Sequence, residues 1–264
     1  MPRDSCLTVS KRVLFDAPGH EPRDAAFGSA RPAIVAKRLE GAHPNEILKW
    51  AVETLDESLT LSVSFGNAEG MVLLDMLSRI TDKVRVFTLD TGFLFEETVR
   101  FREKVMRKYP LPLKVLTPEL SVEEQVERYG PELYSCKPEI CCQVRKIEPQ
   151  RRFLMDYGAW ITGIRRDQTA QRRNTPIVAY DEFFRVAKIA PLAAWGAEDV
   201  HEYVKRYEVP LNPLLSMGYR SIGCEPCTRP VAPGEGERAG RWPGLEKTEC
   251  GLHITGGKVH RAKL

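Results

Sequence analysis

The sequence predicts an α/β fold in which a parallel sheet carries helices on both faces. From residue 43 onward, short apolar strands alternate with helical segments, and the strands end in turns of small and polar residues. Such alternation is typical of parallel sheets that helices cover on both sides. The regular pattern fades after Pro213. We therefore expect a partly disordered N-terminal extension over residues 1–42, a core over 43–215, and a loop-rich C-terminal segment over 216–264.

The first half of the core is expected to alternate helix and strand. Pro44 suits the first turn of a helix whose apolar residues recur at helical spacing up to residue 55. Ser121 and Glu124 match a capping box for a later helix that Gly130 ends. Between these two helices the pattern predicts strands at 59–65, 84–89 and 113–116 and helices at 69–80 and 96–109.

The second half begins with a predicted helix over 140–157. Pro149 should break or restart this helix, because proline removes a backbone donor. Strands are expected at 159–163 and 184–189, and a helix at 198–207. In the N-terminal extension, a short packed helix near 34–39 is the alternative to disorder.

Composition excludes several classes of protein. The 264 residues are 42% hydrophobic and 28% charged, with a net charge of +3, which are ordinary globular values. So small a net charge does not predict nucleic-acid binding. No apolar run approaches the roughly 20 residues of a membrane span, and the N-terminus lacks the apolar region of a secretory signal. We expect a cytoplasmic protein with neither nucleic acid nor membrane as a partner; a homo-oligomer remains possible.

Two strand-to-helix turns carry features of an anion site. Residues 62–70 follow a strand, contain small residues and open a helix, so that backbone N–H groups can face an anion. This turn is neither a Walker A loop nor a dinucleotide-binding fingerprint. Residues 163–173 also follow a strand and contain Arg165, Arg166, Arg172 and Arg173. Guanidinium groups pair with phosphate or sulfate. A tight turn and a solvated charged loop are the alternatives.

Seven cysteines, at positions 6, 136, 141, 142, 224, 227 and 250, indicate thiol or metal chemistry. Cys141 and Cys142 are adjacent on a predicted helix, and Cys224 and Cys227 form a C-x-x-C motif. Two pairs of thiolates suit one four-ligand site. Adjacent helical residues point about 100° apart, which favours a multi-iron cluster over a single zinc. A buried apolar pair at 141–142 is the alternative.

Arg145 and Lys146 lie four residues beyond the paired cysteines, at i+4 from Cys141 and Cys142 respectively. Helical residues four apart share a face, so a cation is expected beside the thiolates. There it could offset the charge of a cluster and contact an anionic substrate.

Cys250 has the profile of a nucleophile. It lies next to a glycine in a loop-rich tail, where nearby Arg or Lys residues would favour its thiolate. The competing interpretation is a zinc site formed by Cys224, Cys227, Cys250 and His253. That site would leave Cys141 and Cys142 without a role.

At these motifs the sequence resembles the assimilatory adenylyl-sulfate reductases of the iron–sulfur type, over about residues 43–257. The resemblance rests on Ser64-Phe65-Gly66, Leu89-Asp90-Thr91-Gly92, Cys141-Cys142 with Lys146, Arg165-Arg166-Asp167-Gln168, Gly223-Cys224-x-x-Cys227, Glu237-Arg238 with Arg241-Trp242, and Glu249-Cys250-Gly251-Leu252-His253. It implies an adenine-nucleotide α-hydrolase-like fold of the PP-loop type. The implied substrate is adenosine 5′-phosphosulfate.

The resemblance also implies a role for each motif. Cys250 would attack the sulfate sulfur and expel AMP, and thioredoxin or a similar dithiol would release sulfite from the resulting S-sulfocysteine. Cys141, Cys142, Cys224 and Cys227 would hold a [4Fe-4S] cluster. Substrate contacts would come from Ser64, Gly66, Leu89, Thr91, Gly92, Lys146, Arg165, Arg166, Arg238 and Arg241. The alternatives are a 3′-phosphoadenosine 5′-phosphosulfate reductase, an ATP pyrophosphatase of the same fold, and a zinc-stabilised nucleic-acid-binding module.

Overall fold

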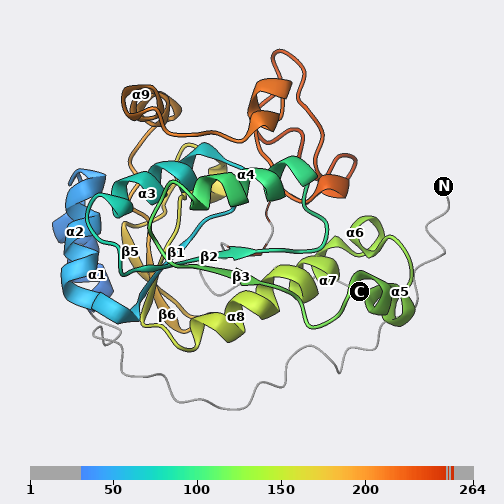
Figure 1. The fold of residues 1–264 in the computed structure, drawn as a ribbon, viewed down its shortest axis with the longest axis horizontal. Coiled ribbons are helices and arrows are strands. Elements are labelled where there is room, and N and C mark those ends of the chain that lie inside the picture. The colour runs from blue at the N-terminus through green and yellow to red at the C-terminus, as the bar shows by residue number, and fades with distance from the viewer. Residues whose placement is uncertain (1–30, 248, 250, 253–264) are drawn as a thin grey trace.

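The computed structural model describes residues 31–247, 249, 251 and 252. Within these residues, the centre is a six-stranded sheet in the order β3-β2-β1-β4-β6-β5 (Figure 1). The strands are β1 (Leu59–Ser62), β2 (Arg85–Leu89), β3 (Leu113–Leu116), β4 (Ala159–Ile161), β5 (Val178–Asp181) and β6 (Val186–Ile189). All neighbours are parallel except β5, which pairs antiparallel with β6. The sheet is thus mostly parallel, as predicted, with an antiparallel edge strand that the sequence pattern had not indicated.

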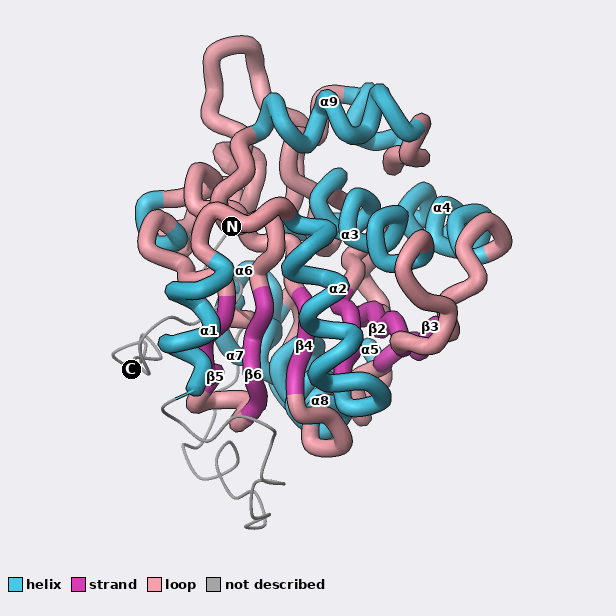
Figure 2. Tube along the Cα trace, turned by 90° about the vertical axis from the view of Figure 1, so that its left-hand side faces the viewer, coloured by secondary structure: helices cyan, strands magenta, loops and turns pink. Residues whose placement is uncertain are grey.

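Helices cover both faces of the sheet (Figures 1 and 2). The longer helices are α1 (Arg31–Leu39), α2 (Pro44–Leu55), α3 (Ala68–Ser78), α4 (Glu96–Met106), α5 (Val122–Tyr129), α8 (Glu148–Leu154) and α9 (Ala197–Tyr207). The short ones are α6 (Leu133–Cys136) and α7 (Pro138–Cys142), with single turns at Asp56–Ser58, Ala170–Arg172, Pro213–Met217 and Glu225–Cys227. Every helix predicted in the core is present, with ends that differ by a few residues. The capping box at Ser121 is also formed.

Two apolar cores lie on opposite faces of the sheet. Successive residues of a strand point to opposite faces, so Val86 belongs to the core beneath α2 and α3, and Phe87 to the core against α8. In β4, Ile161 likewise belongs to the core beneath α2 and α3, and Trp160 to the core against α8. This double burial explains why the central strands are apolar at nearly every position.

The N-terminal boundary of the core differs from the expected one. Helix α1 packs against β5 and buries Ala36 and Leu39 in the larger core. The packed helix near 34–39 is therefore present, and the core begins at least twelve residues before position 43. Residues 1–30 lie outside the described residues.

The helix predicted over 140–157 is interrupted, as expected from Pro149. Helix α7 passes into a π-helical segment, Gln143–Ile147, and α8 then begins at Glu148 with Pro149 in its first turn. Proline is tolerated there because first-turn N–H groups have no partner within the helix. Single π turns occur frequently at functional sites, and this one carries Arg145 and Lys146.

The sheet order creates an opening between β1 and β4. From β1 the chain moves outward to β2 and β3 and then returns to β4 on the other side of β1. The connections after β1 and β4 therefore diverge, and open α/β sheets bind ligands at such a switch point. Residues 208–247, which follow α9, lie over this end of the sheet (Figure 1).

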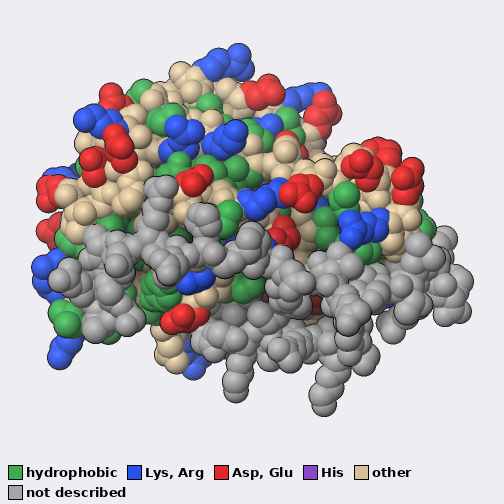
Figure 3. All heavy atoms as spheres, turned by 90° about the horizontal axis from the view of Figure 1, so that it is seen from below, with side chains coloured by type: hydrophobic (Ala, Val, Ile, Leu, Met, Phe, Trp, Pro, Cys, Tyr) green, Lys and Arg blue, Asp and Glu red, His purple; other side chains and the backbone are tan. Residues whose placement is uncertain are grey.

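None of the described helices is long and apolar enough to cross a bilayer. On the face seen in Figure 3, acidic and basic side chains are intermixed over the described residues, with no large area of a single charge.

Candidate active site

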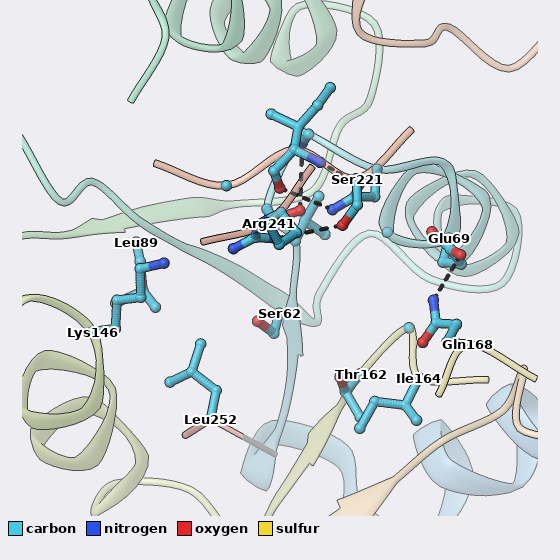
Figure 4. Close-up of a pocket in the computed structure, with 18 of the residues that line it drawn as sticks. Ser62, Glu69, Leu89, Lys146, Thr162, Ile164, Gln168, Ser221, Arg241 and Leu252 are labelled. Atoms are coloured by element: carbon cyan, nitrogen blue, oxygen red, sulfur yellow. Dashed lines mark hydrogen bonds between the residues drawn. The ribbon is translucent and has the colours of Figure 1, made fainter. Parts of the chain in front are cut away.

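A pocket opens at the carboxyl ends of β1, β2 and β4. Its walls come from the turn after β1, from Leu89 and Thr91 after β2, and from residues 162–164 after β4 (Figure 4). Residues 220–224 and 237–241 of the C-terminal segment close it. Segments far apart in the sequence thus meet at the end of the sheet where the sequence placed the ligand.

The turn after β1 brings Ser64 and Gly66 into the pocket wall. Gly66 is required there by a close approach, because a Cβ at this position would lie 3.1 Å from Cβ of Ile222. Asn67 holds the two segments together at the same point: its side-chain amide donates to Ile222 O at 3.2 Å, and its side-chain oxygen accepts from Ile222 N at 3.0 Å. The turn therefore binds the C-terminal segment as well as forming the pocket.

Gly92, in the turn after β2, lies behind the pocket and does not line it. Leu89 and Thr91 line the pocket, whereas Gly92 has a φ of +71° and lies against Val122 and Arg145. Arg145 is buried and fixes this turn, donating to Thr91 O at 2.9 Å. The structure thus gives Arg145 a structural role behind the pocket.

The four cysteines predicted to hold a cluster surround one small cavity beside the pocket. Cys141 and Cys142 come from α7, and Cys224 and Cys227 flank the single turn Glu225–Cys227. None of the four forms a disulfide. Burial raises the pKa of the Cys141 thiol to about 12, and the neighbouring Cys142, Cys224 and Cys227 add to the shift. Burial also raises the pKa of Cys227.

Lys146 lines both the pocket and the cysteine cavity. The sequence had placed a cation at this boundary on the basis of helical spacing. Its positive charge lowers the pKa of Cys141 and Cys227, against the larger effect of burial. Figure 4 shows Lys146 beside Leu89 at one side of the pocket.

Arg238 and Arg241 line the pocket from the C-terminal segment, as predicted. The Arg241 guanidinium lies 4.5 Å from the ring centre of the buried Trp242, and Nη1 lies 3.5 Å from Ser221 Oγ. Its buried Nε has no hydrogen-bond partner among the described residues. A buried donor beside the pocket is suited to an anionic ligand.

Arg165 and Arg166 have protein partners in the structure. Arg165 is buried and ion-paired with Glu69 at 3.1 Å, Asp167 at 3.4 Å and Glu237 at 3.6 Å. Arg166 binds both oxygens of Glu40 and donates to Thr175 O at 2.8 Å. Neither side chain lines the pocket. The structure therefore does not bring these two predicted contacts to the ligand site; Arg165 instead holds carboxylates at the pocket wall.

The segment around Cys250 reaches the pocket from both sides of that residue. Leu252 lines the pocket (Figure 4). Glu249 is ion-paired with Arg172 at 2.6 Å and Arg238 at 3.4 Å, two residues that also line it. Cys250 itself and His253 lie outside the described residues.

Several pocket residues were given no role from the sequence. Glu69, Glu237, Gln168 and Arg220 all line the pocket. Glu69 lies within the segment 62–70 and Gln168 within the arginine-containing segment 163–173, both of which had been identified from the sequence. Their positions in these two segments could therefore have identified them as pocket residues. Arg220 precedes the C-x-x-C motif and has no local pattern that marks it.

The strand order, the pocket and its cations define the class: an α/β protein with a site for a small anionic ligand such as a nucleotide. Residues 58–230 match the family described as the phosphoadenosine phosphosulfate reductase domain, and the chain belongs to that family.

Relatives and solved structures agree with this assignment. An adenosine 5′-phosphosulfate reductase from Halalkalibacterium halodurans is 46% identical over 83% of this chain and 95% of its own. One from Streptomyces coelicolor is 45% identical over 82% and 91%. The crystal structure of the phosphoadenylyl-sulfate reductase from Candida auris has a TM-score of 0.68 at 30% identity, covering 77% of this chain and 98% of that one. Yeast FAD synthetase, with a TM-score of 0.51 at 13% identity over 77% and 70%, shares the fold alone.

Proposed function

We propose that the chain reduces adenosine 5′-phosphosulfate to sulfite and AMP, with Cys250 as the nucleophile and a dithiol protein such as thioredoxin as the donor. The observation that carries the proposal is the position of the flanking residues. Glu249 and Leu252 both reach a pocket that is lined by Lys146, Arg238 and Arg241. The contacts of these two near neighbours of Cys250 support a role for its thiolate at this pocket.

The chemistry divides into two displacements at sulfur. The Cys250 thiolate attacks the sulfate sulfur, and an S–S bond forms between Cys250 Sγ and that sulfur. The S–O bond to the phosphate breaks, and AMP is the leaving group. A donor thiolate then attacks Cys250 Sγ, sulfite leaves with the electron pair of the S–S bond, and a mixed disulfide joins Cys250 to the donor. The second donor thiolate attacks the donor sulfur of that bond, which forms the donor disulfide and releases the Cys250 thiolate. Covalent catalysis commonly replaces one difficult step by two easier ones.

The protein contributes charge stabilisation to the first step. A thiolate approaching an anionic sulfate is repelled, and fixed cations offset both the repulsion and the charge that develops on the leaving group. Lys146 and Arg241 are the cations best placed for this, since both line the pocket and the Arg241 guanidinium is held by Trp242 and Ser221. The turn with Ser64 and Gly66 would accommodate the nucleotide at the opposite wall.

The four cysteines fit a [4Fe-4S] cluster better than a single metal ion. Their side chains surround one cavity, yet within the described part of the chain no three Cys, His, Asp or Glu groups converge closely enough to coordinate one ion. A cluster binds each thiolate through a different iron, so its ligands need only surround it. With four thiolate ligands such a cluster would carry a net negative charge, which Lys146 at the wall of the same cavity would offset. Thiolate ligands and a dithiol donor suit a reducing compartment such as the cytoplasm.

The test is turnover and metal content of protein purified without oxygen. We expect about four irons and four sulfides per chain. Cys250→Ser should retain this iron and bind AMP but release no sulfite, whereas Cys227→Ser should lose iron. The wild-type protein, incubated with substrate and no donor, should carry one sulfonate on Cys250 by mass spectrometry.

Four results would contradict the proposal. Sulfite release by Cys250→Ser would exclude the nucleophile, and one zinc without sulfide would favour the site that includes Cys250 and His253. Faster turnover of the 3′-phosphorylated nucleotide would change the substrate, and pyrophosphate release from ATP would change the reaction.

A further inference from the structure

Glu249 ties the residue before the proposed nucleophile to the loop after β4. Arg172 donates to the Glu249 carboxylate from Nε at 2.9 Å and from Nη2 at 2.6 Å, and Thr169 Oγ1 donates at 3.3 Å. A two-pronged pair between guanidinium and carboxylate fixes orientation as well as distance. The backbone at 249 is therefore held in a defined place relative to the pocket.

The pair is shielded from solvent. The Arg172 side chain is 9% exposed and that of Glu249 is 18% exposed. Burial favours the neutral form of Glu249, but the hydrogen bond and charge of Arg172 hold the pKa of its carboxyl below the usual value. Removing either partner from such a pair leaves a poorly compensated charge, which disrupts the contact strongly.

Side-chain contacts connect this pair to the turn after β1. Arg172 Nη1 donates to Gln168 Oε1, and Gln168 Nε2 donates to Glu69 Oε1 at 2.8 Å. Glu69 lies in the first turn of α3, directly after the turn that contributes Ser64 and Gly66 to the pocket (Figure 4). The tail and the nucleotide turn are thus anchored to the same loop.

The pocket arginines differ in what they hold. The two-donor edge of Arg172 is occupied by Glu249. Arg241 instead contacts Ser221 at 3.5 Å, and its buried Nε has no hydrogen-bond partner among the described residues. The short, paired contacts of Arg172 serve the tail, and the longer contact of Arg241 can be exchanged for that of a ligand.

We propose that the Glu249–Arg172 ion pair is the positioning device for the nucleophile, because it anchors the residue that precedes Cys250 to the loop after β4. This inference rests on the proposed function of Cys250. Glu249 then acts through its neighbour and does not bind substrate. Its loss should slow the formation of the S-sulfonate while nucleotide affinity is preserved.

The experiment compares Glu249→Gln and Arg172→Lys with Glu246→Gln in cluster-loaded protein. Glu246 is an exposed carboxylate three residues earlier in the same segment, so its variant is the matched control. Single-turnover AMP release from adenosine 5′-phosphosulfate measures sulfonation, and calorimetry measures AMP binding. We expect Glu249→Gln and Arg172→Lys to slow sulfonation by about ten- to a hundredfold, the scale of a misplaced reacting group. The AMP affinity of Glu249→Gln should stay within about twofold, and Glu246→Gln should match the wild type.

A charge swap distinguishes the pair from two separate effects. Glu249→Arg combined with Arg172→Glu should sulfonate at least about tenfold faster than the slower single variant, because paired residues are not additive. A wild-type sulfonation rate in Glu249→Gln, weaker AMP binding with an unchanged rate, or a swap no faster than the single variants would overturn the proposal. Cys250→Ser separates the two hypotheses: activity in that variant defeats the proposed function, whereas an inactive Cys250→Ser with a fast Glu249→Gln defeats only the positioning role.

Discussion

The Thr91 hydroxyl lies 3.3 Å from the Cys224 thiol and joins the wall of the pocket to the cysteine cavity. Thr91 Oγ1 also accepts a hydrogen bond from Phe93 N at 3.2 Å. With that lone pair occupied, the hydroxyl proton is available to a Cys224 thiolate. A side chain in contact with the ligand site therefore also contacts a proposed ligand of the cluster.

Thr91→Val should remove this coupling with little change in side-chain shape. We expect the rate of iron loss to a chelator to rise, or turnover to fall, by about ten- to a hundredfold, the usual effect of losing an outer-shell partner of a metal site. Thr91→Ser keeps the hydroxyl and serves as the control. Iron retention and turnover in Thr91→Val equal to the wild type would show that the contact has no functional weight.

Lys146→Ala should weaken binding of the phosphosulfate. Lys146 lines the pocket, and a charge-assisted hydrogen bond contributes about 1.5–3 kcal/mol, or about a ten- to a hundredfold change in Kd. Lys205→Ala removes an exposed lysine from α9 and is the control for net charge. Substrate titration of the Cys250→Ser background measures Kd without turnover. An unchanged Kd would remove Lys146 from the site.

Gly223→Ala should displace Arg241. A Cβ at position 223 would lie 2.3 Å from Nη2 and 2.5 Å from Cζ of Arg241, so the guanidinium must leave its place over Trp242. Because the obstructing atoms are the end of a long side chain, the fold should survive while substrate affinity falls about tenfold, the effect of losing one charged contact. Gly236→Ala is the matched control, since its Cβ would meet nothing within 4 Å. Equal affinities in the two variants would contradict the role of Arg241.

Tyr203→Phe should destabilise the packing of α9 on α3. Tyr203 donates to the buried Asp75 at 2.8 Å, and Tyr109 donates to the same carboxylate at 3.1 Å. Loss of one such bond costs about 1–3 kcal/mol in the free energy of unfolding. Tyr207→Phe keeps the ring that stacks on Tyr203 at 4.4 Å and should change stability by no more than about 0.5 kcal/mol. Urea unfolding measures both, and equal values would refute the assignment.

Alkaline pH should weaken the same cluster of side chains. Burial and the Asp75 charge raise the pKa values of Tyr109 and Tyr203 well above the usual range. Their stabilisation is complete below the unfolded pKa of about 10 and is lost as the pH rises, because the unfolded chain releases these protons first. The free energy of unfolding should fall less steeply above about pH 10 in Tyr203→Phe than in the wild type. Parallel slopes would contradict this coupling.

The sequence predicted features that depend on local pattern and missed those that depend on distant partners. Strands β1, β2 and β4 and the turns after them were found because apolar runs and small residues mark them. Strand β5 was missed because its two middle residues are only half-buried and it ends in Asp181, so it lacks the apolar run of the central strands.

The arginines show the same limit within the site. Arg165 and Arg166 lie in a motif that favours anion binding, yet their carboxylate partners Glu40, Glu69 and Glu237 are remote in the sequence. Nothing in a local pattern reveals that a guanidinium is already neutralised. Arg238 and Arg241, which the family resemblance proposed as substrate contacts, do line the pocket, where each of them contacts Ser221 and Trp242.

The order of the site segments along the chain has a consequence for biosynthesis. The nucleotide turn after β1 and the cysteines of α7 are translated well before Cys224, Cys227 and the tail that contains Glu249. A nascent chain can therefore assemble strands β1 to β4, whereas the cysteine cavity stays half-formed until the last segment leaves the ribosome. Loading of the proposed cluster would then follow translation, and a chain truncated before residue 220 would retain the nucleotide turn but lack both the complete thiol site and the proposed nucleophile.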